Sequence, residues 1–557
     1  MNIPPQISVA ALCFGLLSTS LLAQTGGPGD RGGRATLGTK IFGENQWRIS
    51  ECRNAGDLDG DGCDDILVGT PRSSPDGHVD IYSGATMTIM RSHIGVDASD
   101  DFARAYGRLS DWNGDGVNEY FISAPATDGF LSKVDDNVGV LTIYDGATGA
   151  ILRMLGGDSV DGYFGANAFG ETDFNGDGIS DLAVMSECTG STGASTEISI
   201  YSGADYTSPT WAPFFLRTIT PIGLTLNSAP DADGDGLDDL IIHWGDRNRI
   251  MSSVTGNILF EPTYVSYKYA RIGDLDGDGV DDMLFGNKGS GASFSDGIVY
   301  VYSGATRAGL YYVWGPPYHG WELGSAMAGM GDVDADGYED FAAGAPSRTL
   351  GSNLDYGMAV LYSGKTGDIL YHYRAYPAAG YFGDRMASAD IDGDGSLELL
   401  VGAGDTHHFD GVNNHFNAGM ITPLGFEPLM YISEREMSSS AGAVVTFYHN
   451  FPGANTQFAL LASQTGTSPV TLQGGIPVPL VYDYATSVMY NSPPAWFSNS
   501  IGTTDAMGQA VTTLTLYPND AAGLVGTDIW FSVLGFNGSE GPGMHWASCV
   551  QKLTILP

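Results

Sequence analysis

The stretch DLDGDGCDD at residues 57–65 recurs six more times along the chain, and this repetition decides the fold. The other copies are DWNGDGVNE at 111, DFNGDGISD at 173, DADGDGLDD at 231, DLDGDGVDD at 274, DVDADGYED at 332 and DIDGDGSLE at 390. Copies of one motif at intervals of 43 to 62 residues indicate a tandem array of similar units. The chain therefore contains seven copies of one structural unit.

Each unit surrounds its nonapeptide with segments that are typical of β-strands. In the first unit the nonapeptide runs into ILVGTP, and VDIYSGAT comes later. Alternating apolar residues, β-branched and aromatic side chains and glycine punctuation predict four strands per unit. Seven such units predict an all-β fold with a seven-bladed β-propeller over residues 36–425, because closing the ring removes exposed sheet edges. Units four and seven match least well, since IMSSVTGNIL and GMITPLGF replace the Tyr-Ser-Gly strand.

The nonapeptide has the oxygen chemistry of a calcium loop. Positions 1, 3 and 5 are Asp or Asn, position 6 is Gly and position 9 is Asp or Glu. Oxygen donors at alternating positions, with a backbone carbonyl at position 7, wrap one hard cation, and glycine permits the sharp turn. Mg²⁺ prefers fewer protein ligands, and transition metals prefer His or Cys. We therefore predict up to seven structural Ca²⁺ ions, one in the loop between the first two strands of each blade.

The nonapeptide has two alternative interpretations. An EF-hand needs an acidic ligand at position 12, which is apolar in all seven copies, as at Val68. An ordinary Asp-Gly turn without a metal is the second alternative. It leaves several carboxylates close together without a cation to offset their repulsion.

The predicted metal ligands are the side chains at positions 1, 3, 5 and 9 and the backbone carbonyl at position 7. They are Asp57, Asp59, Asp61, Cys63 and Asp65; Asp111, Asn113, Asp115, Val117 and Glu119; Asp173, Asn175, Asp177, Ile179 and Asp181; Asp231, Asp233, Asp235, Leu237 and Asp239; Asp274, Asp276, Asp278, Val280 and Asp282; Asp332, Asp334, Asp336, Tyr338 and Asp340; and Asp390, Asp392, Asp394, Ser396 and Glu398.

The repeats resemble a known family. An aromatic-Gly pair, as in YFGDRMA, precedes DxDGDGxxD, and the next strand ends in Gly-Ala-Pro at residues 344–346. This pattern resembles the FG-GAP repeats in the propeller of integrin alpha subunits and of related bacterial secreted proteins. The resemblance implies adhesion, glycan binding or an accessory role to an enzyme, and the fold does not choose among them.

The resemblance also implies that ligands engage the face opposite the calcium loops. Candidate stacking residues for sugars or peptide side chains on that face are Trp314, Tyr318, Trp321, His407 and His408. The alternative is that these aromatic side chains pack between blades and that the histidines are solvated.

The charge balance excludes one class of partner. The chain has 65 Asp and Glu against 24 Lys and Arg, a net charge of -41, so a nucleic acid or an anionic membrane would be repelled. No GxSxG, HExxH or P-loop is present, and we expect no enzyme. We expect binding of an extracellular protein or polysaccharide. The alternatives are a polysaccharide lyase or hydrolase built on a propeller and a structural envelope component.

The two ends of the chain predict export and a second domain. The apolar run within residues 1–23 is typical of a secretory signal, with a retained anchor as the alternative, and residues 24–35 form a linker. No later segment is long and apolar enough to cross a membrane. We therefore expect a secreted or cell-surface protein. Strand-like runs over residues 427–557 predict a C-terminal β-sandwich.

Four cysteines remain after the signal: Cys52, Cys63, Cys188 and Cys549. They allow three pairings. Proximity in the sequence favours a Cys52–Cys63 disulfide in an exported protein, and four unpaired buried thiols are the alternative.

Overall fold

The structure is a computed structural model of the 557-residue chain. The residues that it describes are 33–37, 40–42, 51–70, 77–97, 99–128, 137–188, 195–208, 213, 215–219, 225–244, 247–262, 268–288, 297–314, 322–334, 336–346, 357–374, 381–404, 408–409, 414–415, 419–428, 430–432, 436–438, 443–450, 457–464, 470–471, 477–478, 497–504, 509–516, 528–536, 544–547 and 551–556. The predicted signal, residues 1–23, lies outside them. The described residues form strands and turns without a helix, so they include no helix that could span a membrane.

Most of the described chain forms four-stranded antiparallel sheets whose strands follow one another in sequence. The first sheet consists of β3 (Glu51–Gly56), β4 (Asp65–Thr70), β5 (His78–Tyr82) and β6 (Ile89–Ile94). All six residues of β4 are buried, whereas no residue of β6 is buried. An apolar second strand is thus covered on both faces by neighbouring sheets, and the fourth strand meets solvent.

Five further sheets repeat this order. They consist of β7 (Tyr106–Arg108), β8 (Tyr120–Ala124), β9 (Val140–Tyr144) and β10 (Ile151–Gly156); β11 (Asn167–Thr172), β12 (Asp181–Cys188), β13 (Ser195–Tyr201) and β14 (Phe215–Ile219); β15 (Thr225–Ala229), β16 (Asp239–Trp244), β17 (Arg247–Met251) and β18 (Ile258–Phe260); β19 (Lys268–Ile272), β20 (Asp282–Asn287), β21 (Ile298–Tyr302) and β22 (Gly309–Trp314); and β23 (Met327–Gly329), β24 (Phe341–Ala345), β25 (Met358–Tyr362) and β26 (Ile369–Arg374).

The last sheet of this series joins the two ends of the repeat region. β27 (Arg385–Ala389), β28 (Glu398–Ala403) and β31 (Met420–Pro428) come from the seventh unit. β31 also pairs with β1 (Gly33–Leu37) and β2 (Ile41–Phe42), so the N-terminal strands complete a sheet whose other strands come from the far end of the repeat region. The predicted boundary at residue 36 falls inside β1.

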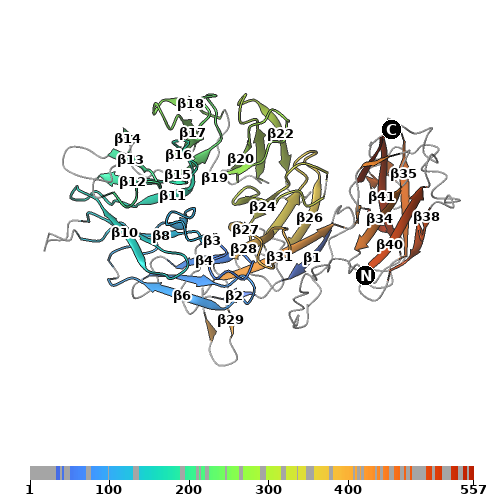
Figure 1. Cartoon of the computed structure of the whole chain (residues 1–557), viewed down its shortest axis with the longest axis horizontal. Helices are drawn as coiled ribbons and strands as arrows, with labels where there is room; N and C mark the ends of the chain where they lie inside the picture. The colour runs from blue at the N-terminus through green and yellow to red at the C-terminus, as the bar shows by residue number, and fades with distance from the viewer. Residues whose placement is uncertain are drawn as a thin grey trace, which may run out of the picture.

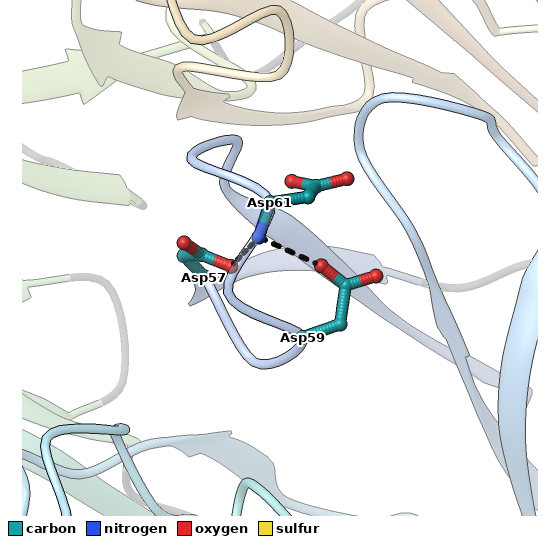
Figure 2. Close-up of side chains that lie close together, drawn as sticks. All are labelled: Asp57, Asp59 and Asp61. Atoms are coloured by element: carbon teal, nitrogen blue, oxygen red, sulfur yellow. Dashed lines mark hydrogen bonds between the residues drawn. The ribbon is translucent and has the colours of Figure 1, made fainter.

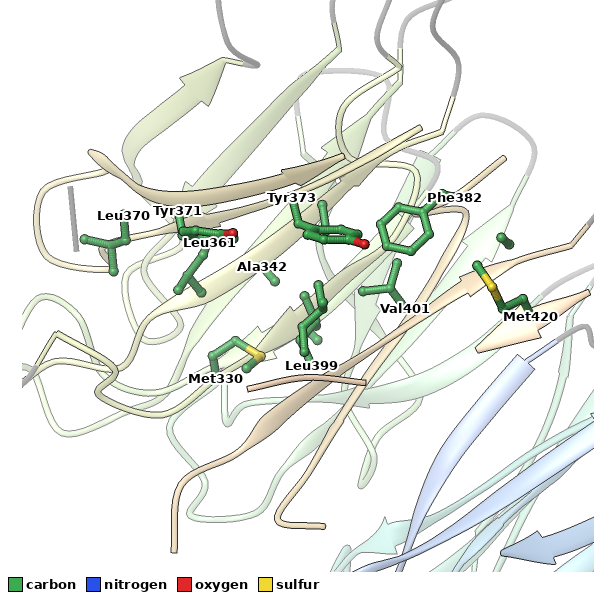
Figure 3. Packing of buried hydrophobic residues seen from close by; sticks show 14 residues of the cluster. Met330, Ala342, Leu361, Leu370, Tyr371, Tyr373, Phe382, Leu399, Val401 and Met420 are labelled. Atoms are coloured by element: carbon green, nitrogen blue, oxygen red, sulfur yellow. The ribbon is translucent and has the colours of Figure 1, made fainter. Parts of the chain in front are cut away.

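The sheets follow one another around a common centre, the arrangement of a β-propeller (Figure 1). The first strands of neighbouring sheets contact each other on the inside, as β3 does with β7 and with β27. Between neighbouring sheets lie apolar clusters. Figure 3 shows one of them, which contains Leu361 of the sixth sheet together with Leu399 and Val401 of the next. The described residues contain seven sheets of this kind, and their cores lie between the sheets.

Most of the strands that follow β31 form a separate lobe beside the ring (Figure 1). One sheet has the order β32 (Met430–Ile432), β34 (Ala443–Asn450), β40 (Gln509–Leu516) and β38 (Phe497–Ser498). The other has the order β33 (Glu436–Ser438), β43 (Gln551–Leu556), β41 (Asp528–Phe536), β35 (Gln457–Ser463) and β39 (Ile501–Thr503), with β42 (Met544–Ala547) beside β41. Two-stranded hairpins are β29 (His408–Phe409) with β30 (Asn414–His415), and β36 (Val470–Thr471) with β37 (Pro477–Val478).

The two sheets of this lobe share an aromatic core. The ring centroids of Phe447 in β34 and Phe531 in β41 lie 4.7 Å apart, and both side chains are buried. Phe497 of β38 lies 6.1 Å from Phe531. These aromatic contacts join the two sheets, and the predicted C-terminal β-sandwich remains a prediction.

Candidate metal sites

The seven acidic nonapeptides occupy equivalent places in the fold, between the first and second strands of the seven sheets. In the first repeat, the loop leaves β3 after Gly56 and enters β4 at Asp65. The repeat sequence thus places one set of oxygen-rich side chains in each sheet, at the same end.

Each loop is wrapped around its own carboxylates. In the first loop, Asp57 Oδ1 accepts hydrogen bonds from the N–H groups of Gly60 and Asp61, at 2.7 and 3.2 Å, and its Oδ2 accepts one from Gly62 at 2.9 Å. Figure 2 shows the Asp61 N–H directed toward the carboxylates of Asp57 and Asp59. The N–H of Cys63 donates to Asp61 Oδ1 at 2.9 Å.

The glycines at positions 4 and 6 are required because the backbone has a positive φ there, not because a side chain would clash. Gly60 and Gly62 have φ values of 78° and 91°, and a Cβ at either would meet no atom within 4 Å. Only glycine adopts this left-handed backbone readily. In the sixth loop Ala335 replaces the first of these glycines, and it lies outside the described residues.

The carboxylate at position 9 is buried and closes the loop. Asp65 is fully buried, and its two oxygens accept N–H groups of Leu58 at 2.9 Å and Gly84 at 3.1 Å. Burial raises the pKa of Asp65 to about 6. Burial also raises the pKa of the other position-9 carboxyls: Asp282 to about 6, Glu119, Asp181 and Asp239 to about 7, Glu398 to about 8, and Asp340 further still. A nearby cation would favour their ionised forms.

The Tyr-Ser-Gly turn after the third strand supports this carboxylate, a role that the sequence analysis missed. A Cβ on Gly84 would lie 2.0 Å from the carbonyl oxygen of Asp64. The glycine therefore allows the turn to pack on the loop and to donate its N–H to Asp65. Gly203, Gly304 and Gly364 make the equivalent N–H donation in their repeats. The Ser-Gly pair that recurs after the third strand is the sequence pattern that could have identified this role.

The donor set fits a hard divalent cation. Asp57, Asp59 and Asp61 each offer one oxygen, and these three atoms lie within 4.8 Å of one another. The same holds for Asp111, Asp115 and Glu119; Asp231, Asp233 and Asp239; Asp274, Asp276 and Asp282; and Asp332, Asp334 and Asp336. Clustered carboxylate oxygens are the ligands that such ions prefer. The loops thus form acidic clusters that could hold a divalent cation, and the predicted role of the position-7 carbonyl remains a prediction.

Two of the predicted ligand-binding residues, Trp314 and His408, lie among the described residues, and their role in binding remains a prediction. Trp314 ends β22, is 57% exposed and stands edge-to-face with Tyr312, with ring centroids 5.7 Å apart. His408 begins β29. Tyr318, Trp321 and His407 lie outside the described residues.

The predicted Cys52–Cys63 disulfide is wrong. Both are free, buried thiols, and Cys188 is free as well. Cys52 lies in the apolar cluster between the first and seventh sheets with Val68 and Leu400, whereas Cys63 lies on the acidic loop. Burial raises the pKa of Cys52 and of Cys63 to about 12, which makes both thiols unreactive. Cys549 lies outside the described residues.

Comparison with known proteins agrees with this geometry. The FG-GAP repeat model matches residues 54–85, which span the first acidic loop and the Tyr-Ser-Gly turn. The chain contains an FG-GAP repeat. It is similar to integrin alpha-V of Gallus gallus, with 40% identity over 83 residues, which is 14% of this chain and 7% of the relative.

Other relatives are of the same kind. Integrin alpha-4 of Xenopus laevis is 32% identical over 142 residues, 23% of this chain and 13% of the relative. Integrin alpha-8 of Gallus gallus is 28% identical over 203 residues, 34% of this chain and 19% of the relative. The chain therefore spans less than a fifth of the length of these relatives. The likeness supports an FG-GAP, integrin alpha-like propeller.

Proposed function

We propose that this chain is a secreted or cell-surface β-propeller that binds Ca²⁺ in up to seven loops and that mediates binding to an extracellular protein or polysaccharide. The observation that carries the proposal is the joint occurrence of acidic oxygen clusters in equivalent loops and of similarity to integrin alpha subunits. We assign residues 1–23 to a signal, 24–35 to a linker, 36–425 to the propeller and 427–557 to a C-terminal β-sandwich.

Ca²⁺ is the cation that the loops suit best. Each nonapeptide offers four oxygen-bearing side chains and a backbone carbonyl, and Ca²⁺ accepts six to eight oxygen ligands in a flexible arrangement. When bound, the ion supplies positive charge that offsets the repulsion among the loop carboxylates. The chain's own residues orient those carboxylates through backbone N–H groups, and Asp65 links the loop to the turn at Gly84.

We place the partner-binding surface on the face opposite the loops. The acidic loops engage their own backbone, which leaves them little freedom to hold a partner. Trp314 and Tyr312 on β22 offer exposed aromatic surface, and such rings stack on sugars and on peptide side chains.

The test is a binding screen of the full chain against glycans and matrix proteins, with Ca²⁺ and with excess chelator. We expect calcium-dependent binding to at least one class, weakened by Trp314→Ala. Product release from a polysaccharide would show an enzyme instead. Self-association without any ligand, measured by sedimentation at several concentrations, would show a structural component instead.

A further inference from the structure

The second acidic loop differs from the others in two places at once. Its position 3 is Asn113 rather than Asp, which removes one carboxylate. Its turn after the third strand carries Asp145, where other repeats have serine at Ser83, Ser202, Ser252, Ser303 and Ser363. The third loop also has asparagine at position 3, Asn175, but keeps Ser202. Loops two and three therefore form a natural pair for comparison.

A serine is sufficient for this turn. Ser303 Oγ accepts the N–H of Thr306 at 3.1 Å, and Ser83 Oγ accepts that of Thr86 at 3.3 Å. Asp145 makes the same bond with one oxygen, since its Oδ1 accepts the N–H of Thr148 at 2.7 Å. The second carboxylate oxygen of Asp145 is not needed to hold the turn.

That second oxygen faces the acidic loop. Asp145 Oδ2 lies 3.1 Å from the Asn113 amide nitrogen, which also donates to Glu119 Oε1 at 2.8 Å and to Asp115 Oδ2 at 3.2 Å. Three carboxylates from the loop and the turn thus converge on one electropositive NH₂ group. Carboxylates converge in this way where positive charge offsets their repulsion.

The third loop shows how the asparagine and the turn residue are bonded when the turn carries serine in place of Asp145. The Asn175 amide donates to Asp181 Oδ1 at 3.1 Å, and the Ser202 hydroxyl donates to Asp177 Oδ2 at 3.1 Å. The turn residue there contributes a hydroxyl to the loop rather than a carboxylate. The two asparagine loops therefore differ by one negative charge.

We propose that Asp145 is an additional cation ligand of the second loop and replaces the carboxylate that Asn113 lacks. The inference rests on the cation binding proposed above. With Asp145 the second site has four carboxylates, Asp111, Asp115, Glu119 and Asp145, as many as the all-aspartate loops. The third site has three, so its affinity is lower, because affinity for such ions rises with the number of charged ligands.

The sequence provides a luminescence probe for the second loop and its neighbour. Trp112 is the only tryptophan in the seven nonapeptides, and tryptophan transfers excitation to a nearby Tb³⁺ ion. Trp112 also contacts the third loop, because its indole N–H donates to the carbonyl oxygen of Ser180 at 2.9 Å. Emission from Tb³⁺ that is excited through tryptophan and lost in Trp112→Phe therefore reports the second and third sites together, and the change caused by Asp145→Ser is measured against an unchanged contribution from the third site. Phenylalanine stands at the same position of the third loop, as Phe174, so this variant should fold.

The experiment titrates the full-length chain with Tb³⁺ and then displaces Tb³⁺ with Ca²⁺. We expect Asp145→Ser to lower the affinity of the second site for both ions about tenfold. Adding Asn113→Asp to this variant should restore the affinity. Ser202→Asp provides the reciprocal change in the third loop. An affinity of Asp145→Ser within twofold of the parent chain, or no restoration by Asn113→Asp, would overturn the inference.

Two controls keep the outcomes separate. If the parent chain gives no chelator-reversible emission, the proposed cation binding itself fails. If Asp145→Ser does not fold by circular dichroism, Asp145→Asn keeps the side-chain size and removes the charge, and it must show the same loss of affinity.

Discussion

The propeller sheets and the C-terminal sheets bury polar groups in different ways. Each propeller loop buries a carboxylate, as at Asp65, and holds it with backbone N–H groups. The C-terminal lobe buries His449, whose Nε2 is hydrogen-bonded to Thr512 Oγ1 at 2.7 Å. Its Nδ1 has no hydrogen-bond partner among the described residues. The propeller thus retains buried acids where a cation would offset them, whereas the lobe holds a neutral ring.

Removal of divalent cations should separate the two regions most strongly. Because the proposed ions would bind only the folded propeller, each site occupied at a hundredfold excess over its Kd would add about 2.7 kcal/mol of stability. We expect excess chelator to lower the propeller melting temperature sharply and to leave the C-terminal transition in place. Differential scanning calorimetry of the full chain checks this. An unchanged propeller transition would contradict the metal assignment.

The next effect concerns the packing of the turn on the loop. Gly84→Ala should destabilise the propeller by about 3 kcal/mol, because the added Cβ would lie 2.0 Å from the carbonyl oxygen of Asp64 and the turn must shift. The measurement is urea unfolding with and without Ca²⁺. The C-terminal transition serves as the internal reference. A loss of stability below 1 kcal/mol would show that the close contact between Gly84 and the Asp64 carbonyl oxygen does not fix the turn.

The fourth repeat shows a second solution to the same contact. Ser253 stands where Gly84 stands in the first repeat, and its hydroxyl donates to the carbonyl oxygen of Asp238 at 2.7 Å. Its N–H still donates to Asp239 at 3.2 Å. A matched Gly84→Ser variant should therefore lose less stability than Gly84→Ala, because serine can convert the close approach into a hydrogen bond.

The repeated motifs predicted the features that neighbouring residues in the sequence determine. The propeller fold, the strands and the loop positions follow from repeated motifs, and the FG-GAP resemblance is confirmed. Pairing of β1 with β31 was missed, because no local signal marks a partner nearly 400 residues away. The fourth repeat looked weak because Ser252 and Ser253 replace Ser-Gly, yet they keep the turn. Proximity in the sequence favoured a Cys52–Cys63 disulfide, but it does not determine which way the two side chains face, and both thiols are free.

Low pH should destabilise the C-terminal lobe because the buried ring of His449 is neutral in the folded state. Burial lowers the pKa of His449 to about 3, so between this value and 6.5 the unfolded chain binds one more proton than the folded one. The neutral ring's contribution is fully present above pH 6.5 and is lost as the pH falls below it, by up to about 1.4 kcal/mol per pH unit. Unfolding of the lobe from pH 7 to 5 should show this slope, and His449→Gln should remove it. The same slope in His449→Gln would assign the effect to carboxyl groups.

The smallest expected effect separates backbone strain from cation binding within one loop. Gly62→Ala places a Cβ where no atom lies within 4 Å, but at a φ of 91°. The cost is therefore about 1 to 2 kcal/mol of left-handed backbone strain, without a steric clash. Because Gly62 N–H holds Asp57 Oδ2, relaxation of that strain would displace a predicted ligand, so the loss should be larger with Ca²⁺ than with chelator. Equal losses under both conditions would mean that the strain stays in the backbone and that the first loop keeps its ligand geometry.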